Sequence, residues 1–201
     1  MPKKSSEANY CKAVVIVHGK SEYLLVQHIK SVLHLSIEIY GKKKGKNSIQ
    51  INRLMKELNN SIFKSQRALL NNYEIEVKDK KLKNFKLFAI MDTDDCVEQN
   101  RDRYINKEMF NGHPLKEYIV PIYNINTLED VIKKSGIYYK KIKDSEKGST
   151  YIKLFPQESK KIIEKDDVEQ LQEMYRKLKK IRETNLEELI KYCIDNAKLI
   201  E

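Results

Sequence analysis

The 201-residue sequence has only three cysteines and no long hydrophobic run. Cys11, Cys96 and Cys193 lie far apart without C-x-x-C spacing, which argues against a disulfide framework and a zinc site and favours the reducing cytoplasm. No segment approaches the roughly 18 consecutive apolar residues of a transmembrane helix, so we expect no membrane association. The N-terminal stretch also lacks the apolar core of a secretory signal, and residues 1–11 are predicted to be a polar lead-in.

Acidic residues are fewer than basic ones, 29 Asp and Glu against 39 Lys and Arg, which gives a formal net charge of +10. The basic excess is concentrated in GKKKGK (41–46) and KDKKLKNFK (78–86). Such a field attracts polyanions, nucleic acid above all, although a solvated lysine-rich surface is the alternative. The chain is 40% hydrophobic, enough to bury a core despite its 34% charged residues.

Three short segments, residues 13–18, 86–91 and 118–124, have the apolar character of strands that are buried on both faces. SIEIY (36–40) predicts a further, shorter strand. Helical periodicity separates these segments, so the predicted order is β-α-β-α-β-α-β-α. Such alternation predicts an α/β domain over residues 12–140, with a parallel sheet of about four strands, flanking helices and right-handed crossovers.

The start of each helix in this domain is predicted from a side chain that can accept a hydrogen bond from the first helical turn. The expected N-caps are Ser21, Asn47 or Ser48, Asp95 and Thr127. Asp95 and Thr127 have an acidic residue three positions later, as in a capping box. We expect the helix after Asp95 to run to about residue 109, and Gly136 to end the helix after Thr127.

Two amphipathic patterns follow the α/β region, at residues 171–181 and 186–197. They predict a pair of helices within a C-terminal extension over residues 141–201. Each helix has an apolar stripe that must be covered, either by the α/β domain or by another subunit. The extension is therefore a candidate surface for homo-oligomerisation or for a protein partner.

Polar residues follow the three buried strands at the edge where ligands of parallel sheets collect. Asp92 and Asp94 are two residues apart in what we expect to be an extended segment, so their side chains are predicted to point the same way. Converging carboxylates repel each other, and a hard divalent cation such as Mg²⁺ or Mn²⁺ removes that repulsion. Glu22, in the first turn of its helix, can supply a third carboxylate.

Lysines follow the first two predicted strands. Lys20 lies in the turn after the first strand and can reach a phosphate. A glycine-interrupted basic loop beyond the second strand can follow a nucleic-acid backbone with salt-dependent, sequence-independent affinity. Its candidate nucleic-acid-binding residues are Lys42, Lys43, Lys44 and Lys46. The loop lacks the Walker pattern, so an ATP site is not predicted.

VVIVHGKSEYLL (14–25) resembles the first motif of Toprim domains, a hydrophobic strand followed by Glu, Gly, two residues and an acid. FAIMDTDD (88–95) resembles their second motif, a hydrophobic strand followed by Asp-x-Asp. The order of the motifs and their separation of roughly seventy residues also fit. Among Toprim proteins the chain looks most like the OLD-family and RloB-type nucleases of bacterial defence. NTLEDVI (126–132) is similar to an acidic segment of those nucleases, and the resemblance covers about residues 12–135.

The resemblance implies a Toprim-like, Rossmann-like fold and a nuclease that uses Mg²⁺ or Mn²⁺ on DNA or RNA. It implies that Asp92, Asp94, Glu22 and Glu129 hold metal, with Glu22, Asp92 and Asp94 also in the catalytic set. The chain departs from the pattern at His18, which stands where Toprim enzymes place a catalytic or metal-binding Glu.

Three interpretations of the departure at His18 stay open. Histidine, with an unperturbed pKa of about 6.5, can replace the glutamate in proton transfer or bind a softer metal such as Mn²⁺. Alternatively, the site is inert and the fold serves as a module that binds nucleic acid or protein in defence or repair.

A receiver-like domain is a further alternative for the whole chain, because it also places acids at strand ends. It needs a lysine at a later strand end, however, and the strand ending at Asn124 offers none.

Overall fold

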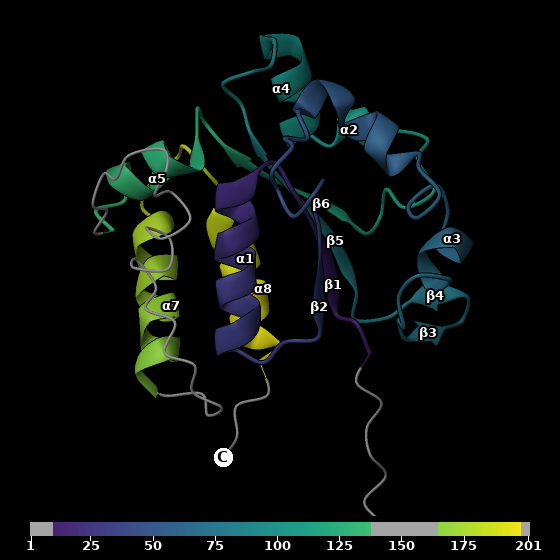
Figure 1. The fold of residues 1–201 in the computed structure, drawn as a ribbon, viewed down its shortest axis with the longest axis horizontal. Coiled ribbons are helices and arrows are strands. Elements are labelled where there is room, and N and C mark those ends of the chain that lie inside the picture. The colour runs from purple at the N-terminus through teal and green to yellow at the C-terminus, as the bar shows by residue number, and fades with distance from the viewer. Residues whose placement is uncertain (1–9, 138–164, 198–201) are drawn as a thin grey trace, which may run out of the picture.

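A computed structural model describes residues 10–137 and 165–197 of the chain (Figure 1). At its centre lies a parallel sheet with the strand order β2-β1-β5-β6. The four strands are β1 (Ala13–Val17), β2 (Ile37–Tyr40), β5 (Lys86–Asp92) and β6 (Ile119–Asn124). Helices flank both faces, and two helices follow at the C-terminal end, so the predicted α/β class and four-stranded parallel sheet are confirmed.

The strands have continuously apolar sequences because helices cover the sheet on both sides. In β1, Ala13, Val15 and Val17 point into one hydrophobic cluster, and Val14 and Ile16 point into the other. All five residues are buried. Alternating side chains of one strand therefore serve two cores, which requires apolar residues at every position.

Four helices contribute to the hydrophobic core on one face of the sheet, and the middle of the chain packs on the other face (Figure 1). The helices of the first face are α1 (Lys20–Val32), α5 (Leu128–Lys134), α7 (Lys165–Leu178) and α8 (Leu186–Asp195). The second face is covered by α2 (Ile51–Leu58), α3 (Gln66–Leu70), α4 (Glu98–Ile105), the 3₁₀ turn η1 (Glu108–Phe110) and the hairpin of β3 (Val77–Lys78) and β4 (Lys81–Leu82).

The two faces are covered by connections that leave β1 and β5 in opposite directions along the sheet. The connection containing α1 leads from β1 to the edge strand β2, whereas α4 leads from β5 to the other edge strand, β6. Because α1 and α4 lie on opposite faces, the chain reverses its winding between β1 and β5. In open α/β sheets, the crevice at such a reversal is where ligands bind.

The C-terminal helices belong to the same hydrophobic core as α1. Leu171, Met174, Leu189 and Ile190 are buried in the cluster that also contains Leu25 of α1. Within this core α7 packs against α8 and α1, so the apolar stripes of α7 and α8 are covered within one chain. The predicted boundary near residue 140 lies outside the described residues, as do residues 1–9 of the polar lead-in.

Tyr192 of α8 adds polar contacts with the start of the sheet. Its hydroxyl lies 2.7 Å from the carbonyl oxygen of Lys12 and 3.2 Å from that of Asn84. Its ring packs edge-on against Phe88 of β5, with 5.2 Å between the centroids. Through its hydroxyl and its ring, Tyr192 thus connects α8 with β5 and with the residues that precede β1 and β5.

The predicted cap of α5 is confirmed, because the backbone N–H of Asp130 donates to the Thr127 hydroxyl over 3.2 Å. The cap predicted for α1 is wrong. Gly19 occupies the N-cap position, and its backbone N–H donates to the carboxylate of Glu22 at 2.8 Å. Ser21 lies inside α1 and its hydroxyl donates to Glu129 instead, so a tertiary hydrogen bond replaces the local one.

The caps predicted for α2 and α4 are also wrong. The helix α2 begins at Ile51, after Asn47 and Ser48, because the backbone N–H of Ile49 donates to His18 and holds the preceding chain on the end of β1. The helix α4 has Val97 as its N-cap, while Asp95 lies in the turn before it. It ends at Ile105, short of the predicted residue 109.

Candidate functional site

The candidate site lies at the carboxyl ends of β1, β5 and β6, where the winding of the sheet reverses. Asp92 and Asn124, the last residues of β5 and β6, are direct neighbours in the sheet. His18 follows β1 and its backbone N–H donates to the carbonyl of Ile90 in β5 at 2.9 Å. The sheet register therefore places three polar side chains from distant parts of the chain on one edge.

Glu22 is the most deeply buried carboxylate of this edge, with 1% of its surface exposed. Its Oε2 accepts the hydrogen bond from Gly19, whereas Oε1 is buried and has no hydrogen-bond partner among the described residues. Burial raises the pKa of Glu22, and the nearby charge of Glu129 raises it further, while His18 acts in the opposite direction. An unsatisfied buried carboxylate oxygen is costly unless a proton or cation pairs with it.

Asp92 is also buried, with 6% of its surface exposed. Its Oδ1 accepts one hydrogen bond, from the side-chain amide of Asn124 at 3.0 Å. Burial and the charge of Glu22 raise the pKa of Asp92 to about 8, against the opposing effect of the Asn124 hydrogen bond. Glu129 and Asp94 raise it further. Glu22 and Asp92 thus belong to one electrostatically coupled group of acids.

Glu129 connects this group to α5. It lies in the first turn of α5, and its Oε1 accepts a hydrogen bond from the Ser21 hydroxyl at 2.7 Å. This contact joins the N-terminal ends of α1 and α5. Glu129 is half-buried and its charge acts on both Glu22 and Asp92, so the structure places it close to these two acids.

Asp94 does not project beside Asp92 as an extended segment would require. The strand β5 ends at Asp92, and Thr93 donates its backbone N–H to the carbonyls of Asn124 and Asn126 at 3.1 Å and 3.0 Å. These bonds turn the chain toward the end of β6. The prediction that the side chains of Asp92 and Asp94 point the same way is therefore wrong, because the segment is not extended after Asp92. Asp94 is exposed in the following turn, and of the acids whose charge raises the pKa of Asp92 it has the smallest effect.

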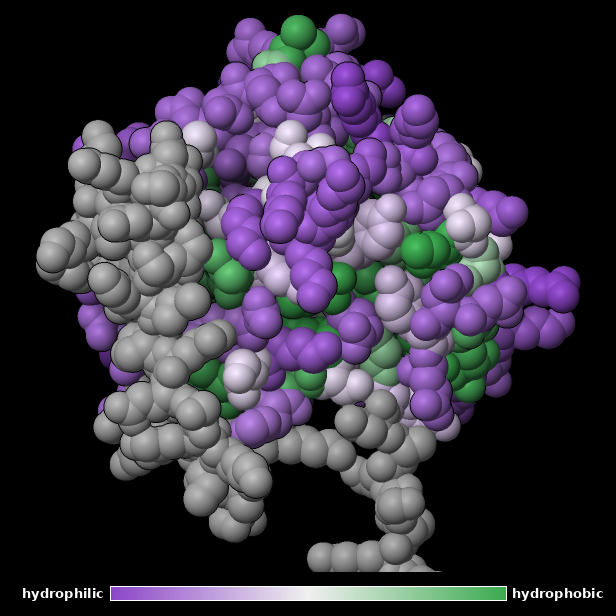
Figure 2. All heavy atoms as spheres, in the orientation of Figure 1, coloured by the Kyte–Doolittle hydropathy of each residue, from purple (hydrophilic) through white to green (hydrophobic). Residues whose placement is uncertain are grey.

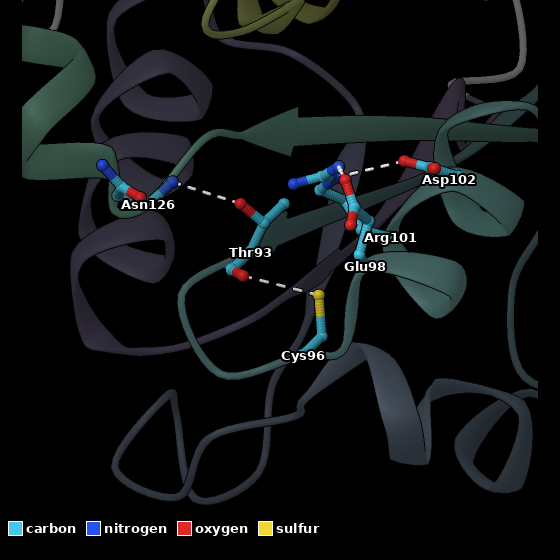
Figure 3. A network of polar contacts seen from close by, with 6 residues as sticks. All are labelled: Thr93, Cys96, Glu98, Arg101, Asp102 and Asn126. Carbon is cyan, nitrogen blue, oxygen red and sulfur yellow. Dashed lines mark hydrogen bonds and ion pairs between the residues drawn. The ribbon is translucent and has the colours of Figure 1, made fainter.

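The turn after β5 is held by contacts that the sequence patterns did not predict (Figure 3). The Thr93 hydroxyl accepts the backbone N–H of Asn126 at 3.1 Å, and the Cys96 thiol lies 3.4 Å from the Thr93 carbonyl. Arg101 pairs with Glu98 and Asp102 beside this turn. The loop carrying Asp94 is thereby fixed on the end of β6.

His18 is half-buried beside Glu22. Its backbone is held on both sides, by Ile90 through its N–H and by Ile49, which donates to its carbonyl at 2.8 Å. Its ring atom Nδ1 is buried and has no hydrogen-bond partner among the described residues. A ring nitrogen in that position is available to a proton, a metal ion or a ligand.

A divalent cation suits the chemistry of these residues. Glu22 and Asp92 present buried oxygens with raised pKa values and mutual repulsion, which a cation removes. Within residues 10–137 and 165–197, no three His, Cys, Asp or Glu side chains are arranged to hold a metal ion as they stand. Mg²⁺ needs fewer, because it usually binds one or two carboxylates together with waters and substrate phosphates.

The basic loop after β2 lies directly on the turn that carries His18 and Glu22. A Cβ on Gly45 would stand 2.5 Å from the carbonyl oxygen of Gly19, and Gly41 packs equally closely against Val17. Gly45 has a φ of +80°, and Lys43 and Lys44 before it are also left-handed. The loop is therefore closely packed against the end of β1 through glycines that no larger residue can replace without displacement.

Four of the five predicted nucleic-acid-binding lysines are exposed at the site, namely Lys20, Lys43, Lys44 and Lys46. The fifth, Lys42, is engaged by an ion pair with Glu57, with 2.6 Å between Nζ and Oε1. The Lys20 ammonium lies 5.4 Å from the ring centre of Tyr23. The surface over α2 and α4, at this end of the molecule, is predominantly hydrophilic in Figure 2.

Sequence patterns missed one residue that contacts this site from the C-terminal part of the chain. Thr184 donates to the side chain of Asn124, which in turn holds Asp92. Thr184 lies between two predicted helices in a segment without a motif. Only its contact across 60 positions of sequence connects it to the acids.

We expect Gly45→Ala to destabilise the protein more than Gly112→Ala. Both glycines have a φ of +80°, but a Cβ on Gly112 meets nothing within 4 Å, so Gly112 controls for the backbone conformation alone. The control should lose about 1 kcal/mol of unfolding free energy. Gly45→Ala should lose about 1–3 kcal/mol more because it also displaces the loop. Urea denaturation measures both, and equal losses would contradict the close packing of the loop.

Stability of the metal-free protein should fall as the pH rises from about 4 to about 8. The folded-state pKa of Asp92 is raised from 3.8 to about 8, so the folded state binds more protons than the unfolded state across this window. The stabilisation that Asp92 contributes is complete below its unfolded-state pKa of 3.8, and it is lost as the pH rises through its folded-state pKa of about 8.

Asp92→Asn removes this titration. Between pH 5 and pH 9 the unfolding free energy of both proteins is measured by urea denaturation with a chelator present. The decrease over this range should be about 1–3 kcal/mol smaller in Asp92→Asn than in the wild type. Asp130→Asn, an exposed acid next to Glu129, is the control and should follow the wild type. Parallel curves for all three proteins would contradict a raised pKa at Asp92.

No protein-family model, curated protein or solved structure matches this chain, so the assignment of a function depends on the site itself. None of the described helices combines the length and apolar character needed to cross a bilayer.

Proposed function

We propose that the protein is a divalent-metal-dependent enzyme that cleaves or otherwise processes phosphodiester bonds of DNA or RNA. The observation that carries this proposal is the burial of Glu22 and Asp92 together at the switch point of the sheet, next to a basic loop. Raised pKa values in a crevice between strands mark functional sites more often than stable cores. The exposed lysines of the loop supply the matching affinity for a polyanionic substrate.

The proposed roles follow from the position of each residue. Asp92 and Glu22 hold Mg²⁺ or Mn²⁺, and Asp94 and Glu129 assist from the edge of the group. The bound ion supplies charge stabilisation to the phosphoryl group under attack. His18, whose Nδ1 lacks a hydrogen-bond partner among the described residues, stands where it can transfer a proton. The exposed lysines bind the substrate backbone, namely Lys20, Lys43, Lys44 and Lys46.

The resemblance to Toprim nucleases supports this proposal through the same residues. The Asp-x-Asp motif and the glycine turn lie at the carboxyl ends of the two central strands of the sheet, β5 and β1.

The proposal also includes a role in bacterial defence or nucleic-acid repair and a place in the cytoplasm. The free thiols of Cys11, Cys96 and Cys193 are compatible with a reducing compartment.

A second candidate is a catalytically inert module that binds nucleic acid or a partner protein. The observation that favours it is His18, which replaces the glutamate of the Toprim pattern. The buried stripes of α7 and α8 are part of the chain's own core, so a protein partner or second copy would contact their outer faces. Binding by such a module would survive Asp92→Asn.

The first test is cleavage of single- and double-stranded DNA and RNA in Mg²⁺ and in Mn²⁺. The wild type should cleave at least one of these substrates, and Asp92→Asn and Glu22→Gln should each lower the rate by about 100-fold or more. Asp130→Asn should retain the wild-type rate, because that carboxylate is exposed outside the group. Loss of activity in the control as well would remove the basis for assigning the site.

His18→Glu separates the two candidates. If wild type is inactive and His18→Glu cleaves in a metal-dependent way, the inert module is correct and the scaffold is silenced at one residue. If the wild type cleaves and Asp92→Asn does not, the enzyme is correct. A folded wild type and His18→Glu that neither cleave nor bind Mn²⁺ would contradict the metal-dependent function.

Nucleic-acid affinity should depend on the basic loop. Replacing both Lys43 and Lys44 by Gln should reduce the slope of log affinity against log salt concentration by about 1 for each phosphate that the loop no longer neutralises. The matched control is the double replacement of Lys78 and Lys81 by Gln, in the hairpin of the other basic run. Fluorescence anisotropy with a labelled oligonucleotide measures both. An equal change in the control would mean that charge anywhere on the surface suffices.

A further inference from the structure

The C-terminal part of the chain contacts the candidate site through two consecutive hydrogen bonds. The Thr184 hydroxyl lies 2.9 Å from Oδ1 of Asn124, and the Asn124 amide nitrogen lies 3.0 Å from Oδ1 of Asp92. Asn124 is fully buried and Thr184 is 3% exposed. We propose that Thr184 and Asn124 are positioning residues that orient the Asp92 carboxylate toward the cation, an inference that rests on the proposed function.

Thr184 is held in place by the residues on either side of it. The carbonyl of Glu183 accepts the backbone N–H of Ile125 at 2.7 Å. The Asn185 side chain accepts the N–H of Tyr123 at 2.9 Å and donates to the carbonyl of Pro121 at 3.0 Å. This segment therefore lies along the edge of β6 as a short antiparallel neighbour, and Thr184 pairs directly with Asn124.

The hydroxyl of Thr184 fits the orientation of Asn124 in which the amide oxygen faces Thr184. The Thr184 hydroxyl accepts the backbone N–H of Leu186 at 3.0 Å, so its own hydrogen is directed to other acceptors. The acceptors within reach are Oδ1 of Asn124 and, at 2.8 Å, the carbonyl of Tyr123. A hydroxyl hydrogen pairs with the amide oxygen and not with the amide nitrogen.

Asp92 must be ionised to bind a cation, and an ionised carboxylate only accepts hydrogen bonds, so the amide nitrogen of Asn124 must then face it. The reverse orientation would place the amide oxygen against a carboxylate oxygen and repel it. One oxygen of Asp92 is fixed by this hydrogen bond, which leaves the second oxygen to the ligand. In metal sites, residues that hold a ligating carboxylate in this way typically contribute 10–100-fold to affinity or activity.

The test compares Thr184→Val, which removes the hydroxyl at similar volume, with Thr184→Ser, which retains it. Asn185→Ala is the matched structural control, because it loosens the same segment from β6 without touching Asn124 or Asp92. The first measurement is made without metal, by hydrogen exchange in NMR of the Asn124 side-chain amide. The backbone amide of Ile125 is followed in the same spectra as a reporter of segment docking.

Thr184→Val should accelerate exchange of the Asn124 amide by at least about tenfold relative to that of Ile125. Thr184→Ser should retain the wild-type ratio of the two exchange rates. Asn185→Ala should change the exchange rates of the Asn124 and Ile125 amides by the same factor. Thr184→Val should also weaken Mn²⁺ binding by about tenfold, while Asn185→Ala and Thr184→Ser stay close to the wild type. An equal loss of Mn²⁺ affinity in Thr184→Val and in Asn185→Ala would indicate docking alone and overturn the proposal.

The outcomes separate this inference from the function on which it rests. An unchanged exchange ratio in Thr184→Val overturns the positioning role whatever the metal does. An altered ratio with unchanged Mn²⁺ affinity also overturns it, because Asp92 would then bind equally well without the contact. Absence of Mn²⁺ binding by the wild type overturns the metal-dependent function, and it overturns with it the part of the inference that concerns the cation.

Discussion

The burial of two like-charged carboxylates at one end of the sheet is the constraint on which the rest of the structure depends. Glu22 and Asp92 are almost fully removed from water, yet neither forms an ion pair with a Lys or Arg among the described residues. Each accepts one hydrogen bond, Glu22 from the backbone N–H of Gly19 and Asp92 from the side-chain amide of Asn124. A protein selected only for stability would fill this space with apolar side chains, because an unpaired buried charge costs more than it contributes.

The parallel sheet explains why the acids meet at this place. The central strands are apolar and are covered on both faces, and polar side chains follow at their carboxyl ends. The reversal of winding between β1 and β5 separates α1 from α4, and ligands of open α/β sheets collect at such reversals. The close contact of Gly45 with Gly19 places the lysines of the loop beside the end of β1 without pairing them with the buried acids. In the proposed function, this positive charge would attract the substrate while the carboxylates would bind the cation.

The sequence predicted the elements whose causes are local. Continuous apolar runs identified the strands, and the alternation of strand and helix identified the parallel sheet. Thr127 was identified as a cap because its acceptor function is satisfied within one turn. Predictions were wrong where a residue distant in the sequence replaces the local hydrogen-bond partner. Ser21 bonds to Glu129 instead of its own helix, and Thr93 bonds to the end of β6, which turns Asp94 away from the line of the strand.

The same reasoning explains why Thr184 has no sequence signature although it contacts the centre of the site. Its effect on Asp92 passes through Asn124, and both contacts exist only after α8 has docked on the sheet. The stripe of α8 is buried with α1, whose first turn holds Glu22. Docking of α8 therefore contributes to the core that holds α1 and brings Thr184 to the hydrogen bond that leads through Asn124 to Asp92. The C-terminal segment thus completes the geometry of a site whose charged residues all come from the first 130 residues of the chain.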